Sequence, residues 1–211
     1  IRSCLVGSEM CIRDRPWLNK QKIIDHSNYK FVNFSTSKFY FLFALIHVLN
    51  VSCEEMIFGE EIIYPGIKIT FEAAPKDIIY PIENYLAESN TDIHIEMLIN
   101  WHKDSPEGSP VGGFIPYLNV TATIKNKNGD LITTQLTPHI NITDNFHYAQ
   151  NIKLPGDLRD MYDVSVKISP PSSNDLGIHF DWKEKYEYLL LEKVFNYQDL
   201  YFGDIALKSR R

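Results

Sequence analysis

The sequence has few cysteines, and all of them lie within its first 53 residues: Cys4, Cys11 and Cys53. The rest of the chain therefore cannot form a disulfide framework, a thiolate metal site or a thiol nucleophile. The chain also lacks a basic run in its body, and its net charge is −6, which argues against nucleic acid as a partner. No apolar run reaches the roughly 18 residues of a membrane-spanning helix.

The composition that remains is globular and favours strands. Hydrophobic residues make up 44% and charged residues 23% of the 211 residues, which suits one domain preceded by a processed segment. Twelve Tyr, twelve Phe and many Ile, Val and Thr are typical of β-structure. These features predict an all-β protein and leave its function open.

The N-terminal region is expected to lie outside the folded domain. The chain starts with Ile1, and residues 1–15 have neither helical nor strand periodicity. They look like a translated sequencing adapter, so we interpret them as a non-native segment. The alternative is a genuine disordered N-terminus.

Residues 16–53 are typical of a signal peptide region. Lys30 and Lys38 precede an apolar stretch from Phe39 to Leu49, and small residues follow up to Cys53. A buried helix is the alternative, but the abrupt acidity after residue 53 favours a cleavage boundary. Lipid anchoring at Cys53 is a second alternative, which Asn50 disfavours because a lipobox has Leu at that place.

Residues 54–211 are predicted to form one acidic domain. The first 53 residues hold seven of the 21 basic and three of the 27 acidic residues, which leaves a net charge of −10 on the remainder. An acidic exported domain attracts cations. Period-2 alternation predicts an immunoglobulin-like antiparallel β-sandwich. Its strands are expected at Ile67–Phe71, Ile93–Trp101, Tyr117–Lys125, Leu131–Leu136, His147–Leu154, Tyr162–Ile168 and Lys185–Phe195, with a type I′ turn at Asn128-Gly129. The core is expected to contain Ile93, Ile95, Val120, Ile124, Val164 and Val166.

Histidines are the candidate chemical groups, because neutral imidazole is a common ligand of transition metals. His94 and Glu96 share one face of a strand whose opposite face is apolar, so we expect them on the outer face or in a groove between chains. His139 and His147 flank a turn, and a hairpin there would bring them close together. His179 follows a Pro- and Ser-rich loop. Spacing alone leaves open whether these groups converge or are solvated surface residues.

An ordered set of motifs resembles a known family. The motifs are Asp92-Ile93-His94-Ile95-Glu96, Gly113 through Leu118, Pro138 through Tyr148, and Gly177-Ile178-His179. From about Tyr64 to Tyr197 the chain is similar to the bacterial periplasmic iron-transport proteins, which are dimeric, bind copper and accompany inner-membrane iron permeases. The resemblance implies an immunoglobulin-like fold, a periplasmic location, homodimerisation, a permease partner and no catalysis.

The resemblance also implies a metal site. It assigns His94, Glu96, His147 and His179 as ligands, with His179 coming from the partner subunit across the dimer interface. The family's Met-Pro-Met stretch reads Thr137-Pro138-His139 here, so His139 takes the place of a Met ligand. The implied metal is copper, with iron, zinc and manganese as alternatives.

Two other classes of function stay open on the sequence. A non-metal binding module for a partner protein or glycan predicts that His94, His147 and His179 lie far apart. A hydrolase would need an activated serine or an open zinc site, and the sequence has no Gly-x-Ser-x-Gly motif.

Overall fold

A computed structural model describes residues 55–209 of the chain, apart from residues 143 and 145. The expected non-native segment and the signal peptide region therefore lie outside the described residues. Within the described part, no helix has both the length and the apolar character needed to cross a membrane.

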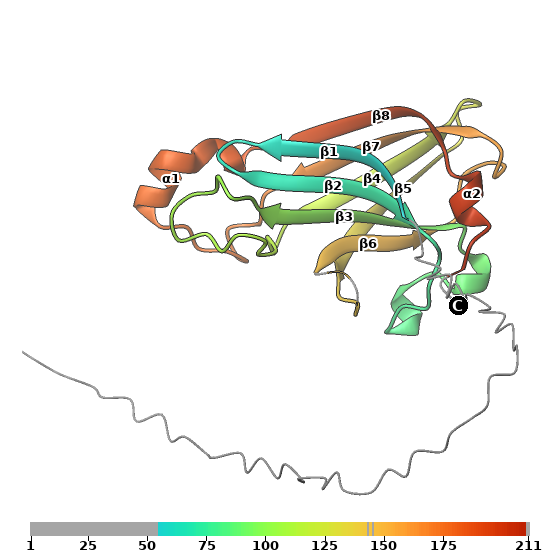
Figure 1. The fold of residues 1–211 in the computed structure, drawn as a ribbon, viewed down its shortest axis with the longest axis horizontal. Coiled ribbons are helices and arrows are strands. Elements are labelled where there is room, and N and C mark those ends of the chain that lie inside the picture. The colour runs from blue at the N-terminus through green and yellow to red at the C-terminus, as the bar shows by residue number, and fades with distance from the viewer. Residues whose placement is uncertain (1–54, 143, 145, 210–211) are drawn as a thin grey trace, which may run out of the picture. The chain divides into compact units, whose positions relative to one another are not determined.

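The described chain folds into antiparallel β-structure (Figure 1). The strands are hydrogen-bonded in the order β1-β2-β3-β6-β5-β4-β7-β8. Their bounds are β1 Met56–Ile63, β2 Ile67–Ala74, β3 Ile93–Trp101, β4 Asn119–Asn126, β5 Leu131–His139, β6 His147–Ile152, β7 Met161–Ser169 and β8 Lys193–Tyr201. The predicted all-β class is confirmed.

Strand β5 joins the two layers of the sandwich. Its first part pairs with β4, from Leu131 to Leu136, and its last residues pair with β6, from Thr137 to His139. β1, β2, β3 and β6 thus form one layer, while β4, β7 and β8 form the other. A strand that changes layers in this way turns the corner of a sandwich.

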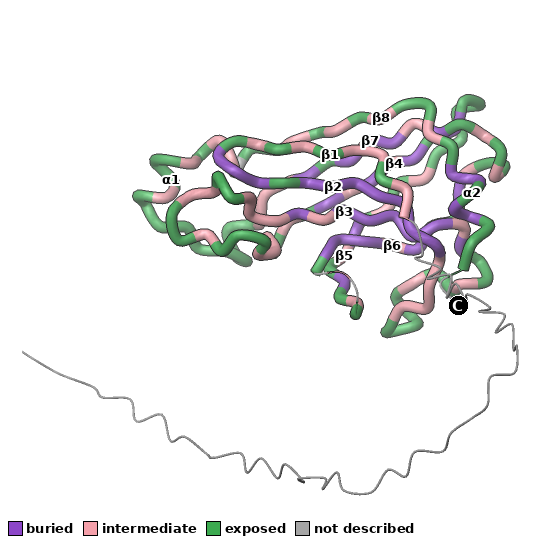
Figure 2. The backbone as a smooth tube through the Cα atoms, viewed as in Figure 1, coloured by how far each residue is buried: buried purple, intermediate pink, exposed green. Residues whose placement is uncertain are grey.

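The core lies between the layers, where the alternation predicted it. The six side chains expected there are all at most 1% exposed: Ile93, Ile95, Val120, Ile124, Val164 and Val166. Phe71 is fully buried, with ring centroids 5.3 Å from Phe195 and 5.4 Å from Tyr197 across the layers. Burying each such side chain contributes roughly 1.5–3 kcal/mol. Figure 2 shows this buried band along β2, β3 and β6.

Side chains close the seam between the two edge strands. Tyr197 of β8 donates a hydrogen bond to Glu61 Oε1 of β1 at 3.1 Å, and its ring meets Phe58 edge-on at 5.5 Å. Gly59 lies under this ring, and a Cβ at that position would overlap the ring's outer atoms. The register of β1 also shifts between Ile57 and Gly59.

The C-terminal part differs from the prediction. The strand expected at Lys185–Phe195 is right only from Lys193 on, where β8 begins. Before it, α1 (Phe180–Tyr186) and the 3-10 helix η3 (Glu187–Leu190) take the place of a strand, and α2 (Gly203–Ala206) follows β8. Apart from Glu187, the run from Tyr186 to Leu191 is apolar, and its three successive leucines do not alternate with polar residues, so periodicity could not separate helix from strand. β1 was not predicted, because Gly59 and the adjacent Glu60 and Glu61 break its pattern.

The turn after β4 also differs from the predicted type I′ turn. Gly129 has a positive φ of 99°, but Asn128 does not, and a type I′ turn needs both. Instead, the Asn126 side-chain oxygen accepts hydrogen bonds from the backbone N–H of Asn128 at 3.0 Å and of Asp130 at 2.9 Å. An asparagine side chain thus organises a longer loop.

Candidate metal centre

Three histidines and a glutamate share one face of the first layer. His94 and Glu96 lie on β3, His139 ends β5 and His147 begins β6. The strand register places His139 directly opposite His147, as the predicted hairpin required. His94 and Glu96 lie opposite Asn151 and Ala149 of β6. These two positions follow His147 at every second residue, so they share its strand face. Pleating therefore sends all four side chains to the same side.

The donor atoms of the three histidines converge. Those of His94, His139 and His147 lie within 4.8 Å of one another. Glu96 Oε1 is 3.7 Å from His94 Nε2, and Glu96 Oε2 is 4.0 Å from His147 Nε2. Two donors bound to one ion at ~2 Å each are at most ~4 Å apart. A small contraction of the side chains would therefore bring these donors to one metal ion.

The cluster is buried, and this corrects the expectation that His94 and Glu96 lie on an outer face. Their exposures are 2% and 1%, and those of His139 and His147 are 8% and 1%. The segment after β2, with the 3-10 helices η1 (Ile82–Asn84) and η2 (Glu88–Asn90), covers this face. Figure 1 shows these short helices beside β6. Alternation reports which side chains share a face, but not what a distant segment places over it.

Neighbouring side chains hold the His139 ring, and one of its ring nitrogens has no hydrogen-bond partner among the described residues. Its Nε2 is 3.2 Å from Thr137 Oγ1, which is 3.2 Å from the Tyr85 hydroxyl. Its buried Nδ1 has no hydrogen-bond partner among the described residues. Burial, reinforced by the neighbouring His147, lowers the pKa of His139 to about 4. The ring is therefore neutral near pH 7, as metal coordination requires.

Carboxylates extend the cluster on the side of Glu96. Carboxylate oxygens of Glu55, Glu96 and Asp144 lie within 4.8 Å of one another. Glu72 of β2 is the register partner of Glu96 and is 5% exposed. Burial, together with the charge of Glu55 and a hydrogen bond to it, raises the pKa of Glu72 to about 7. Clustered acidic groups of this kind favour a cation among them.

A hollow of about 390 Å³ leads to the histidines. Its lining combines the histidines with the covering segment and the turn after β5: Asp77, Ile78, Ile79, Tyr80, Tyr85, His94, Pro138, His139, Ile140, Asn141 and His147. Tyr80 and Ile140 at its rim are 74% and 68% exposed. The buried donors therefore lie at the inner end of a partly apolar opening.

His179 does not join the cluster within this chain. It precedes α1 as its N-cap residue and is exposed. It lines a different hollow with residues of α1 and the preceding loop, among them Asp181, Trp182 and Tyr186. The chain thus brings together His94, Glu96, His139 and His147, and it leaves His179 on the surface.

The sequence interpretation missed several residues of the site, of which Asn151 is the most informative. It is 4% exposed, and its side-chain oxygen lies 2.8 Å from His94 Nδ1. Period 2 from His147 would have found it, because His147, Ala149 and Asn151 share one strand face and asparagine is uncommon inside strands. Glu72, a charged residue in the buried half of β2 between Phe71 and Ala73, was a second overlooked signal.

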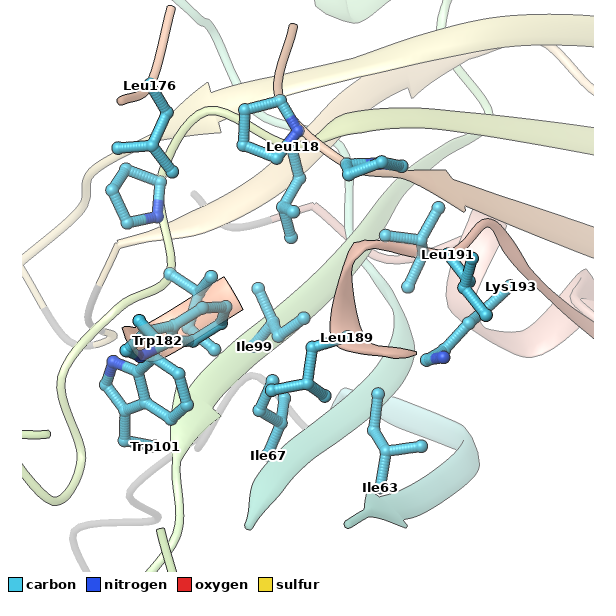
Figure 3. Close-up of a pocket in the computed structure, with 15 residues that line it drawn as sticks. Ile63, Ile67, Ile99, Trp101, Leu118, Leu176, Trp182, Leu189, Leu191 and Lys193 are labelled. Atoms are coloured by element: carbon cyan, nitrogen blue, oxygen red, sulfur yellow. The ribbon is translucent and has the colours of Figure 1, made fainter. Parts of the chain in front are cut away.

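A third hollow, shown in Figure 3, is unsuited to a metal. It measures about 200 Å³ and lies at the end of the sandwich that α1 and η3 cover, with Trp101, Leu118, Trp182 and Leu189 in its wall. Among the described residues, Lys193 is its one ionisable lining side chain, and a lysine ammonium offers no lone pair. This hollow provides no ligand set.

The donor set at the first site suits particular metals. Imidazoles and a carboxylate fit Cu(II), Zn(II), Ni(II) and Fe(II), whereas Cu(I) favours thioether or thiolate sulfur. The neutral His139 ring, with a buried nitrogen that lacks a protein partner among the described residues, fits a coordinated ion. The residues present therefore fit a metal, and the site has no serine or cysteine nucleophile among its lining residues.

Comparisons with known proteins point in the same direction. The family described as Fe2+ transport protein matches residues 52–203. A UPF0423 protein of Brucella abortus is 26% identical over 148 residues, which cover 65% of this chain and 76% of that protein. A 34 kDa membrane antigen of Treponema pallidum is 29% identical over 96 residues, covering 45% of this chain and 47% of the antigen.

Solved structures show the same fold. A copper-bound variant of Campylobacter jejuni P19 has 27% sequence identity and a TM-score of 0.59, covering 70% of this chain and 98% of P19. FetP from a uropathogenic Escherichia coli strain has 22% identity and a TM-score of 0.54, covering 69% of this chain and 95% of FetP. The P19 structure carries copper, and the FetP likeness concerns the fold.

Proposed function

Because the chain belongs to the Fe2+ transport protein family, we propose that it is a periplasmic metal-binding protein of iron uptake, without catalysis of its own. Its centre consists of His94, His139, His147 and Glu96. The observation that carries this proposal is the convergence of three buried imidazoles within 4.8 Å, beside a buried carboxylate. Burying so many polar groups together is costly unless something compensates them, and a bound cation would do so.

Copper is the proposed metal of this centre. P19, whose structure was solved with copper, shares 27% identity with this chain. In the absence of sulfur donors among His94, Glu96, His139 and His147, Cu(II) is favoured over Cu(I). Zinc, iron and manganese are the competing ions. The carboxylates of Glu55, Glu72 and Asp144 supply the oxygen ligands that a harder cation prefers.

The non-metal binding module is disfavoured by geometry. That hypothesis expects His94, His147 and His179 to lie far apart, but the ring centroids of His94 and His147 are 6.4 Å apart. His179 is remote within one chain, and we propose that it approaches the centre of a partner subunit in a homodimer. The remaining partner, an inner-membrane iron permease, follows from the resemblance to the family.

Competition titration of the metal-free domain tests the metal centre. Cu(II) should bind at one strong site per chain, and His94→Ala and His147→Ala should each weaken binding strongly. His102→Ala is the matched control, because His102 pairs with Asp104 at 3.1 Å outside the cluster. If wild-type protein binds Cu(II) no better than the His94→Ala variant, the proposed centre is wrong.

Sedimentation and uptake measurements test the partners. Wild-type protein should sediment as a dimer at micromolar concentration, and His179→Ala should lower metal affinity without changing the fold. A monomer with and without copper would overturn the dimer. Cells that express the permease should take up less iron when this protein is deleted, and equal uptake would overturn the proposed role.

A further inference from the structure

Asn151 and His94 form a cross-strand pair inside the protein. They are register partners on β6 and β3, and their exposures are 4% and 2%. The Asn151 side-chain oxygen lies 2.8 Å from His94 Nδ1. At such a distance one of these two atoms donates a hydrogen to the other.

The other contacts of Asn151 decide which atom donates. Its Nδ2 donates to the backbone carbonyls of Asp77 at 2.8 Å and of Leu86 at 2.9 Å. A backbone carbonyl only accepts hydrogen bonds, so the amide NH₂ group must face these two oxygens. The amide oxygen then faces His94, and since this oxygen can only accept, the hydrogen lies on His94 Nδ1.

The tautomer of His94 therefore follows from its surroundings. A neutral imidazole with its hydrogen on Nδ1 has its lone pair on Nε2. Nε2 is the His94 nitrogen that lies 3.7 Å from Glu96 Oε1. Two atoms that both present lone pairs at this distance repel each other unless a proton or a metal ion lies between them.

We infer that Asn151 is the positioning residue of the metal centre: it fixes the tautomer and orientation of His94 so that Nε2 is the metal donor. The inference rests on the proposed metal-binding function. Ligating histidines generally donate their second ring N–H to a neighbouring group, and losing that neighbour typically costs 10–100-fold in metal affinity. In this protein the amide oxygen of Asn151 accepts that N–H, and the amide NH₂ group holds the covering segment against β6.

Nitrogen-15 NMR of histidine-labelled, metal-free wild-type protein tests the tautomer directly. In mildly alkaline buffer, where imidazoles are neutral, His94 should show a protonated Nδ1 and an unprotonated Nε2. A proton on Nε2 would overturn the inference. This measurement needs no variant and no metal, so it stays decisive whether or not the proposed function holds.

Asn151→Leu tests the consequence for binding, because leucine has a similar volume and no acceptor. Its Cu(II) affinity should fall 10–100-fold, and its His94 should no longer hold one tautomer. Thr91→Val is the matched control, since the Thr91 hydroxyl donates to the carbonyls of Leu86 and Ala87 in the same covering segment and does not contact His94. Thr91→Val should keep both the affinity and the tautomer.

The outcomes separate the two proposals. If wild-type protein fails to bind Cu(II), the proposed function fails, while the NMR result still stands for Asn151. If wild-type protein binds and Asn151→Leu binds equally well with an unchanged His94 tautomer, Asn151 is not a positioning residue. An equal loss of affinity in Thr91→Val would assign the effect to the covering segment and would also overturn the inference.

Discussion

His139 and His147 stand directly opposite each other on β5 and β6, with their ring centroids 5.9 Å apart. His94 stacks on His139 from the third strand at 5.2 Å. Strand pairing alone thus brings together three imidazoles from positions up to 53 residues apart in the chain. Donors held by strands keep their spacing better than donors on loops do.

Replacing His139 should change which oxidation state of copper is preferred. His139→Ala should weaken Cu(II) binding, because one of the clustered imidazole donors is lost. His139→Met should raise the affinity for Cu(I) relative to Cu(II), since thioether sulfur is the softer ligand. Competition titrations with both oxidation states measure this, with His102→Ala as the control. Unchanged affinities in His139→Ala would show that His139 is not a ligand.

The metal-free protein should lose stability in mild acid through His139. Its pKa falls from 6.5 to about 4 on folding, so folding favours the neutral ring. This contribution is fully present above pH 6.5 and is lost as the pH falls through 4, by about 3 kcal/mol in all. Chemical denaturation of wild type and His139→Gln at several pH values should give a difference that shrinks in this window. A difference that does not vary with pH would contradict the burial effect.

Glu72 should act in the opposite sense. Its pKa rises from 4.5 to about 7 on folding, so its favourable contribution is complete below pH 4.5 and is lost as the pH rises through 7. Above pH 7, Glu72→Gln should be more stable than wild type by about 1–3 kcal/mol in the absence of metal. Glu83→Gln, at an exposed position on η1, is the control and should show no such gain. A gain equal at pH 4 and pH 8 would refute this explanation.

The seam between β1 and β8 should be sensitive to one added methyl group. Gly59→Ala places a Cβ against the Tyr197 ring and should displace its hydroxyl from Glu61, costing roughly 1–3 kcal/mol. Gly177→Ala meets open space and should be nearly neutral. Thermal denaturation of both variants measures the effect. Additive losses in the Gly59→Ala, Tyr197→Leu double variant would show that the two positions do not interact.

The sequence predicted the fold best where alternation was uninterrupted. The bounds of β3 agree with the prediction because an apolar residue stands at every second position from Ile93 to Trp101. β1 was missed because its edge position tolerates Gly59 and two adjacent glutamates. The strand expected from Lys185 failed because its apolar run suits a short helix equally well, and the contact between Trp182 and Tyr186 at 5.2 Å follows helical spacing.

The sequence indicated which residues of the cluster share a strand face, but it did not indicate which segment covers them. Period 2 placed His94 and Glu96 on one face, and the turn paired His139 with His147. The burial of this face could not be predicted, because its cover comes from a segment whose ties are made by backbone carbonyls of Asp77 and Leu86. Every residue has a backbone carbonyl, so the sequence does not indicate which carbonyls make these hydrogen bonds. The role proposed for His179 requires a second chain, and no pattern within one chain reveals such a contact.

The segment that Asn151 and Thr91 hold over the histidines also bears on how fast an ion exchanges. An ion reaches the buried donors through the hollow of about 390 Å³, whose wall includes Asp77 and Tyr85 of this segment. A change in this wall alters the path and not the donors, so we expect it to change the entry and exit rates by the same factor. Thr91→Val, which removes two hydrogen bonds within the segment, should therefore shorten the residence time of an ion while its equilibrium affinity stays the same.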